Sequence, residues 1–548
     1  MILRRLYLYL VSAAALVLLA AGLALLGATV LLFVFNDPTA DSSRGQLAIF
    51  TAMSIVALPV WGVHFFFAQR FATRDPFERT SAIRRLYVYF ACLTFSLATM
   101  VGLAITLGQL LRPVFDSGET LNGEQMAQDA WATVVFAAVW GFHFWIARED
   151  RTAVHEEGAS ATLRRWYMYA ALIVGLLTML SSAQQLLEMS WTALASKTPH
   201  PVFLSGPAGS AVAGALLWGF HARTIARNHI ADDRHSTLRA LEGFIAVAIS
   251  IATALFGASQ ILYYGLGRAL GVNNPGGASS DVLTAAAGPV SLFLVYGVAW
   301  FLVFRRLRRD AGTQEADRQA GVRRLYTNLA ALISLAAWAI GAGSLFATLF
   351  EQVEAPIIGV KAPDWKDPIS LSVTLTVVGA AVWIAHWRQA PWAADRQSLS
   401  RRLYVWAALL GSVLAVLGGG IGLISSLLQQ LFSANPKLND TANLAFGRYL
   451  AVVLVAAGVA IYHWRVLRAD QSARPPKAAP AAQPAARATS APAIVTSQPA
   501  ADALGPHARR YTLVVTDASD DDVHQALSNL PPQANYRLTP AEQTVDGH

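Results

Sequence analysis

Long apolar segments alternate with short polar ones along most of this chain. Each apolar segment holds about 20–28 residues, which is enough for one helix to cross a hydrocarbon core of roughly 30 Å. The alternation continues to about residue 470 and then stops. The pattern therefore predicts an all-α polytopic membrane protein.

Two short motifs divide the apolar region into six copies of one unit. The sequence Arg-Arg-Leu-Tyr opens an apolar segment at 84–87, and related sequences start 80, 80, 75, 84 and 78 residues apart. The sequence Trp-Gly-Phe-His at 140–143 recurs in related form near the end of each unit. Since both motifs repeat together, we predict about 12 transmembrane helices in six tandem hairpins. The predicted units are hairpin 1 (1–80), hairpin 2 (81–160), hairpin 3 (161–235), hairpin 4 (236–319), hairpin 5 (320–397) and hairpin 6 (398–470).

A two-helix unit sets how the copies are related. Each copy crosses the membrane twice, so the next copy starts in the same orientation. An inverted repeat needs a unit with an odd number of crossings. We therefore expect the hairpins to lie side by side in a ring or an arc, without an inverted repeat.

Each unit also carries aromatic residues and a histidine to one interface. The first helix of a unit starts where the second helix ends, so these side chains share one layer of the membrane, where Trp and Tyr are enriched. The recurring tryptophans are Trp61, Trp140, Trp218 and Trp383, and the recurring tyrosines are Tyr7, Tyr87, Tyr167, Tyr326 and Tyr404. The recurring histidines are His64, His143, His221, His386 and His463.

The sequence leaves several interpretations of these histidines open. In the structural one, which we favour, each imidazole bonds a tyrosine hydroxyl or a carbonyl of the adjacent helix and clamps the hairpins together. In the others, the histidines are candidate ligands of haem or a pigment, part of a site for lipid phosphate or another anion, or members of a proton relay. Polar groups inside membranes are often functional, but the middle of each apolar segment has no charged residue.

Hairpin 4 departs from the pattern at both motifs. Glu242 stands at the tyrosine position and Ala299 at the histidine position. Loss of the tyrosine and the histidine in the same hairpin is expected if these two side chains bond to each other. General decay of one repeat explains the loss nearly as well. Hairpin 4 is either under relaxed constraint or specialised.

The distribution of charge indicates the orientation. The N-terminus, the segments between hairpins and the stretch through residue 468 carry 28 Lys and Arg, whereas the loops inside the hairpins carry 8. Because positive residues near helix ends stay in the cytoplasm, both termini are predicted to be cytoplasmic. With 55% hydrophobic and 14% charged residues, an ordinary soluble enzyme is excluded. The net charge of +8 follows from topology, so no nucleic acid is expected as a partner.

The composition changes after residue 470. Residues 471–508 are rich in alanine and proline, which is typical of an extended linker. Residues 509–548 predict a small cytoplasmic β-α-β-like element with strands near 511–516 and 535–538 around a helix near 519–527. A segment of this size rarely forms its own core, so we interpret it as a docking element.

The sequence contains no recognisable catalytic motif. It has no phosphate-binding glycine loop, no Cys or His cluster with metal-ligand spacing and no hydrolase elbow. We therefore predict no enzyme activity, no catalytic residue, no metal and no cofactor. Our first hypothesis is a non-enzymatic membrane scaffold that binds a protein partner through basic cytoplasmic loops and the C-terminal tail. The alternatives are a channel or carrier with a path along the repeat axis, and haem or pigment binding by the histidines.

The repeated motifs also carry a family resemblance. Tandem hairpins with Arg-Arg-Leu-Tyr at 84–87, Trp-Gly-Phe-His at 140–143 and their counterparts resemble an uncharacterised family of bacterial integral membrane proteins, catalogued as a domain of unknown function. The resemblance covers residues 1–468. It implies a bacterial inner-membrane location and the tandem architecture, and it implies no activity.

Overall fold

The computed structural model describes residues 2–154, 158–196, 201–227, 236–311, 317–387, 398–432 and 445–472. Within these ranges the chain is almost entirely helical and forms no strand, apart from an isolated bridge between Asp116 and Phe203. The chain divides into two compact units, Met1–Pro475 and Pro476–His548. The predicted β-α-β-like element at 509–548 and nearly all of the predicted linker lie outside the described residues.

Twelve long helices pair in chain order within the described residues. Short helices η1 (Asp41–Ser43), α3 (Pro76–Arg79) and η2 (Pro275–Gly277) lie in connections. The long helices are α1 (Ile2–Val34) with α2 (Arg44–Arg74), α4 (Ala82–Phe115) with α5 (Gly123–Ala153), α6 (Gly158–Ala195) with α7 (Ser205–Arg227), α9 (Thr237–Ala269) with α10 (Val282–Ala311), α11 (Asp317–Ile358) with α12 (Lys366–Trp387), and α14 (Leu399–Phe432) with α16 (Ala445–Ser472).

Eleven of these helices are long and apolar enough to cross a membrane. In each of the eleven, at most 33% of the most apolar stretch is buried inside the structure, so most of that apolar surface needs a hydrocarbon environment. Helix α7 is the exception among the twelve, because its first half is rich in Gly, Ala and Ser. These small residues permit close packing: a Cβ at Gly214 would lie 2.7 Å from the backbone nitrogen of Met179 on α6.

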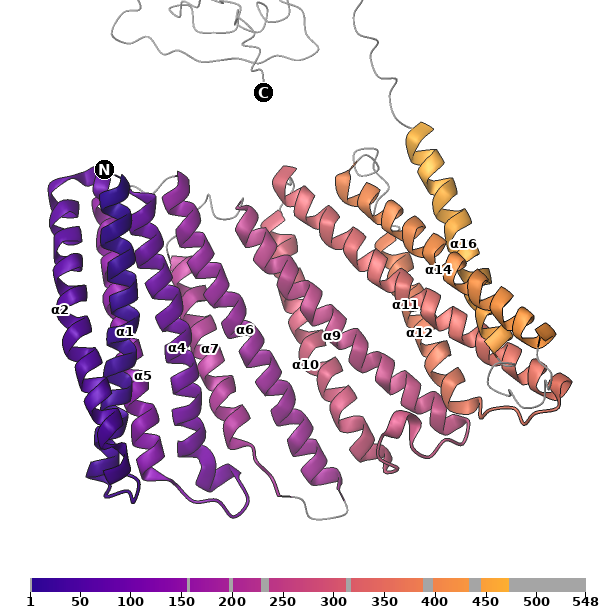
Figure 1. Cartoon of the computed structure of the whole chain (residues 1–548), viewed down its shortest axis with the longest axis horizontal. Coiled ribbons are helices and arrows are strands. Elements are labelled where there is room, and N and C mark those ends of the chain that lie inside the picture. The colour runs from indigo at the N-terminus through magenta and orange to yellow at the C-terminus, as the bar shows by residue number, and fades with distance from the viewer. Residues whose placement is uncertain are drawn as a thin grey trace, which may run out of the picture. The chain divides into compact units, whose positions relative to one another are not determined.

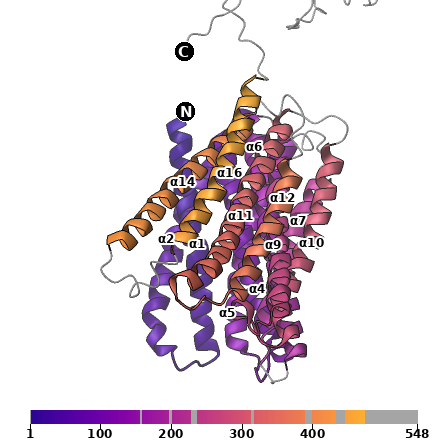
Figure 2. The ribbon, with the colours of Figure 1, turned by 90° about the vertical axis from the view of Figure 1, so that its right-hand side faces the viewer.

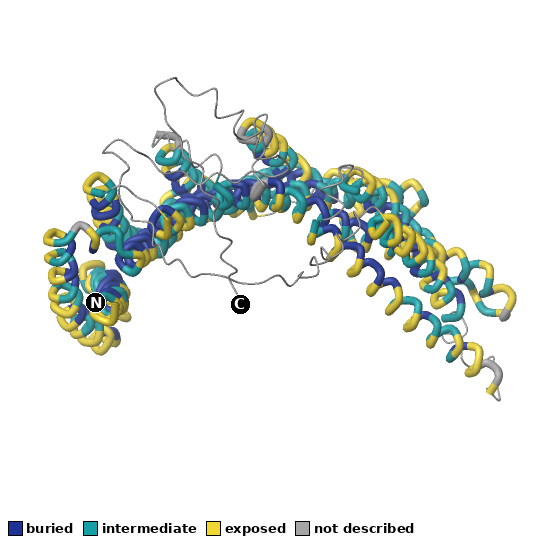
Figure 3. Tube along the Cα trace, turned by 90° about the horizontal axis from the view of Figure 1, so that it is seen from above, coloured by how far each residue is buried: buried dark blue, intermediate teal, exposed yellow. Residues whose placement is uncertain are grey.

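The helix pairs lie side by side in a row within the first unit (Figure 1). In hairpins 2 to 6 the second helix also packs against the first helix of the preceding hairpin, as α5 packs against α1 and α7 against α4. Helices α14 and α16 stand at the far end of the row, which faces the viewer in Figure 2. Figure 3 shows from above that the described helices form an open arc rather than a ring.

Both repeated motifs lie at one end of the helices, which we call the network end. The Ile2 end of α1 and the Ser472 end of α16 are both on this side (Figure 1). Cores of buried apolar residues fill the spaces between neighbouring hairpins here, the largest around Tyr87, Val88 and Cys92. The largest buried core therefore lies where the recurring polar residues of hairpins 1 to 3 occur.

Candidate functional site

Each recurring histidine bonds the recurring tyrosine of its own hairpin. The tyrosine stands near the start of the first helix and the histidine near the end of the antiparallel second helix, so both lie at a similar depth. The distances from the tyrosine hydroxyl to histidine Nε2 are 3.0 Å for Tyr7–His64, 3.0 Å for Tyr87–His143, 2.9 Å for Tyr167–His221, 3.4 Å for Tyr326–His386 and 2.9 Å for Tyr404–His463.

The other ring nitrogen of each histidine is also engaged. In His143 the Nδ1 atom lies 2.8 Å from the carbonyl oxygen of Val139, one turn earlier on the same helix. The other four histidines make the same contact at 2.7–2.9 Å. Because a carbonyl only accepts, Nδ1 carries the proton and Nε2 accepts from the tyrosine hydroxyl. All five imidazoles thus have two protein partners.

Tryptophan supplies the bond between hairpins. Trp61 Nε1 donates to the hydroxyl of Tyr87 at 3.1 Å, and Trp140 Nε1 donates to that of Tyr167 at 3.1 Å. Trp383 makes the same bond to Tyr404 at 2.9 Å. The sequence interpretation placed the clamp between hairpins on the histidines. In the structure the histidine bonds stay inside the hairpin, because each even helix faces its own tyrosine at this depth, and the indole reaches the next hairpin.

Three of the recurring histidines are almost completely buried. His143 and His221 are 0% exposed and His463 is 1% exposed. Tyr7 begins the row and is 58% exposed, because no preceding hairpin covers it. The opposite terminus of the row lacks a donor, since Ala460 in hairpin 6 replaces the recurring tryptophan. The series of bonds therefore has a defined start and a defined end.

Hairpin 4 replaces the tyrosine–histidine pair with an ion pair. Glu242, which is 4% exposed, pairs with Arg306 on α10. Arg306 lies seven residues, or about two helical turns, after Ala299 on α10. Its side chain therefore reaches back along the helix toward the position that a histidine occupies in the other hairpins. Trp218 in hairpin 3 has no tyrosine to bond, and the structure assigns it no hydrogen bond among the described residues. A compensating pair at the altered positions fits specialisation better than decay.

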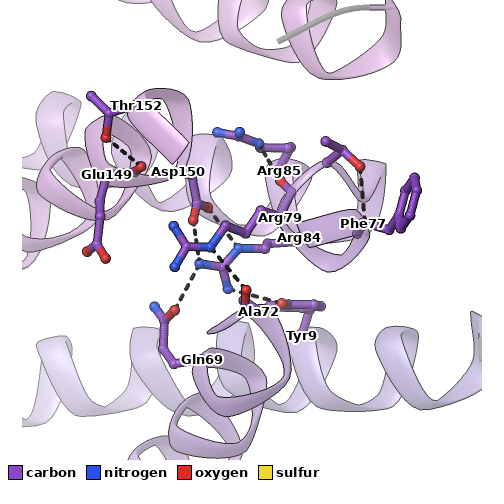
Figure 4. A network of polar contacts seen from close by, with 11 residues as sticks. Tyr9, Gln69, Ala72, Phe77, Arg79, Arg84, Arg85, Glu149, Asp150 and Thr152 are labelled. Carbon is purple, nitrogen blue, oxygen red and sulfur yellow. Dashed lines mark hydrogen bonds and ion pairs between the residues drawn. The ribbon is translucent and has the colours of Figure 1, made fainter. Parts of the chain in front are cut away.

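A second buried network surrounds Arg84 in hairpin 2 (Figure 4). Its guanidinium forms two bonds to Asp150 on α5, from Nε to Oδ2 at 2.8 Å and from Nη2 to Oδ1 at 3.0 Å. It also reaches hairpin 1, donating to the Tyr9 hydroxyl at 3.2 Å and to Gln69 Oε1 at 2.9 Å. Arg84 is 1% exposed and Asp150 2%. Such a buried pair is held by its geometry, and loss of one partner is costly.

The same ion pair recurs in hairpin 6. Arg401 Nε lies 2.7 Å from Asp470 Oδ2, and its guanidinium stacks 4.5 Å from the ring of Trp387 in hairpin 5. Sequence reasoning missed these pairs because it used the arginines as a signal of membrane orientation. The sequence did contain a signal for these pairs, because Asp150 and Asp470 both come seven residues after the recurring histidine. At the same position hairpin 4 has Arg306, an opposite charge that matches the replacement of tyrosine by Glu242.

The chemistry available at the network end is that of hydrogen bonding and ion pairing. Among the described residues, no group of three or more His, Cys, Asp or Glu side chains is placed to hold a metal ion. An iron ligand at any recurring histidine would have to displace a tyrosine hydroxyl or a backbone carbonyl. The geometry brings the predicted histidines and tyrosines together in five pairs, and three of the four predicted tryptophans bond the tyrosine of the next hairpin, Trp218 being the exception.

Comparison with protein families identifies a matching family. The family model described as "Domain of unknown function (DUF5671)" matches residues 5–133, 117–199 and 324–448. Two of these matches start at the first helix of hairpin 1 and of hairpin 5, and none covers hairpin 4. Searches of curated proteins and of solved structures return no match.

Proposed function

Since the chain belongs to the family of domains of unknown function DUF5671, whose description names no activity, we propose its role from its own contacts. The protein is a non-enzymatic membrane scaffold that holds six hairpins in a row and binds a protein partner at its cytoplasmic side.

The proposed topology has twelve membrane crossings. Eleven helices qualify by length and apolarity, and α7 packs as the second helix of hairpin 3 in the same way as its counterparts. The network end, rich in arginine, lies in the cytoplasm by the positive-inside rule, with both termini on that side. The location is the inner membrane of a bacterium, as the family resemblance implies.

The observation that carries the proposal is the double engagement of every recurring histidine. A histidine that serves as a ligand leaves one ring nitrogen for the metal, and its other nitrogen is oriented by a second group. Here Nε2 faces a tyrosine hydroxyl and Nδ1 a carbonyl in all five hairpins that have the histidine. This arrangement supports a structural role and gives no support to haem or pigment binding.

The open arc also favours a scaffold over a path along the repeat axis. A carrier built from parallel repeats encloses its path between them, whereas the described hairpins pack in series and leave the two ends of the row apart (Figure 3). The partner would meet arginine-rich helix ends and the C-terminal tail. The arginine-rich helix ends suit a partner with an acidic surface.

The proposal is tested by two variants, one that removes a recurring histidine and one that removes the C-terminal tail. A biotin-labelling enzyme fused to the N-terminus should mark the same neighbours in the parent and in His143→Ala, and should lose them when the chain is truncated after Ser472. Purified His143→Ala should keep the parent's visible spectrum. If His143→Ala keeps its fold but loses a visible absorbance band or a measured solute flux, the histidines form a ligand site and the scaffold proposal is wrong.

A further inference from the structure

The tryptophan–tyrosine bonds divide the six hairpins into two linked blocks. These bonds join hairpins 1, 2 and 3 in series, and a third joins hairpin 5 to hairpin 6. Among the described residues hairpin 4 shares no such bond with either neighbour. In hairpin 4 Glu242 replaces the tyrosine that would accept a bond from Trp218 of hairpin 3. Tyr296 replaces the tryptophan that would donate to Tyr326 of hairpin 5.

Other polar contacts of the network end reinforce the same two blocks. Arg84 ties hairpin 2 to hairpin 1 through Tyr9 and Gln69. Trp387 of hairpin 5 donates to the hydroxyl of Tyr462 in hairpin 6 at 2.6 Å. The junction between hairpins 1 and 2 and the junction between hairpins 5 and 6 therefore each have two kinds of directional contact at this end.

The opposite end is bonded across both junctions of hairpin 4. Between hairpins 3 and 4, Gln184 Nε2 donates to Ser291 Oγ at 3.1 Å. Between hairpins 4 and 5, the Tyr263 hydroxyl donates to Asp367 Oδ1 at 2.8 Å. These bonds fix the far ends of the three hairpins to one another, so relative motion there is restricted.

The network end of hairpin 4 packs against hairpin 3 through apolar side chains. Tyr296, Ala299 and Val303 of α10 belong to one core with Leu176 and Leu180 of α6. Apolar contacts have no directional requirement, so helices packed in this way can slide or tilt at small cost. The Glu242–Arg306 ion pair lies within hairpin 4 and keeps its own two helices together.

We propose that hairpin 4 is a hinge between a rigid block of hairpins 1–3 and a rigid block of hairpins 5–6. The pivot is the end opposite the network, where bonds cross both junctions. The network end opens and closes, because there the tryptophan–tyrosine links stop on either side of hairpin 4. This inference does not depend on the scaffold role, since it concerns only how the hairpins are joined.

Pairs of spin labels on the full chain in lipid nanodiscs test the hinge. Leu6, Trp166 and Leu325 occupy the same position of the repeat in hairpins 1, 3 and 5, and are 48%, 54% and 55% exposed. Cysteines at these sites, in a Cys92→Ala background, give matched pairs for distance measurement by pulsed electron resonance. The pair at 166 and 325 spans hairpin 4, whereas the pair at 6 and 166 lies inside the first block.

The hinge predicts a broad or two-component distance distribution for 166–325 and a narrow one for 6–166. Leu194 and Ile357 are exposed near the ends of hairpins 3 and 5 that lie opposite the network end. A spin-label pair at these two sites should give a narrow distance distribution because it spans the pivot. Equal widths for 166–325 and 6–166 would overturn the proposal, as would a 194–357 distribution as broad as that of 166–325.

Two variants test the cause of the motion. Trp140→Phe removes the link between hairpins 2 and 3 and should broaden the 6–166 distribution. A combined variant gives hairpin 4 the pattern of hairpin 2 through E242Y, Y296W, A299H and R306D, and should narrow the 166–325 distribution. If Trp140→Phe leaves the 6–166 width unchanged, the links do not rigidify the block, and the proposal fails even where the combined variant does not fold.

Discussion

Replacement of Trp140 by phenylalanine measures what one link between hairpins contributes. The change keeps an aromatic ring but removes the Nε1–H that donates to the Tyr167 hydroxyl at 3.1 Å. Tyr167 still donates to His221, so the variant leaves no buried donor without an acceptor. The loss should therefore approach that of one interhelical hydrogen bond in a membrane, about 0.6 kcal/mol and at most about 1.7 kcal/mol.

Trp218→Phe is the matched control. Trp218 occupies the same repeat position and is also half-buried, but Glu242 removes its tyrosine acceptor. Both variants lose the same atoms, so their packing costs are similar and the difference between them isolates the bond. Reversible unfolding in mixed micelles gives the free energy of unfolding of each. Trp140→Phe should be the less stable by about 0.6–1.7 kcal/mol, and equal stabilities would refute the link.

The remaining predictions concern the other members of the networks, all checked by the same unfolding assay. Asp150→Asn leaves Arg84 buried without a counter-charge and should lower the free energy of unfolding by about 3–5 kcal/mol. Asp470→Asn should lower it less, because Arg401 is more exposed than Arg84. The reverse order would show that burial does not set the size of the loss. His143→Ala should destabilise modestly, since it removes one clamp of five, whereas replacement of all five recurring histidines should destabilise severely while membrane insertion, measured by protease protection, persists. Unchanged stability of the fivefold variant would contradict a structural role.

The hairpins could be predicted from the sequence because two signals coincide. Apolar length fixes where a helix crosses, and the Arg-Arg-Leu-Tyr and Trp-x-x-His motifs mark where each unit starts and ends. In the structure both motifs sit at one end of paired helices, as in α4 and α5. The layer shared by Tyr87 and His143 followed from this pairing alone, since an antiparallel return brings the end of the second helix beside the start of the first.

The choice of partners within that layer could not be predicted. Whether His143 meets Tyr87 or Tyr167 depends on how the hairpins pack laterally, and the sequence carries no such information. The imidazole beside Tyr167 is that of His221 in its own hairpin, and the indole of Trp140 on α5 reaches the same hydroxyl from the preceding hairpin. Similarly, Arg84 and Asp150 are 66 residues apart in sequence, and only their recurrence as Arg401 and Asp470 could have suggested a pair.

Nitrogen NMR of the histidine side chains in lipid bilayers tests the central claim most directly. The account assigns His143, His221 and His463 a neutral ring with the proton on Nδ1, because Nδ1 faces a carbonyl and Nε2 faces a tyrosine hydroxyl. Tyr87→Phe should shift the Nε2 resonance of His143 and leave that of His463 in place. A proton on Nε2, or a metal-shifted nitrogen resonance at these histidines, would contradict the account.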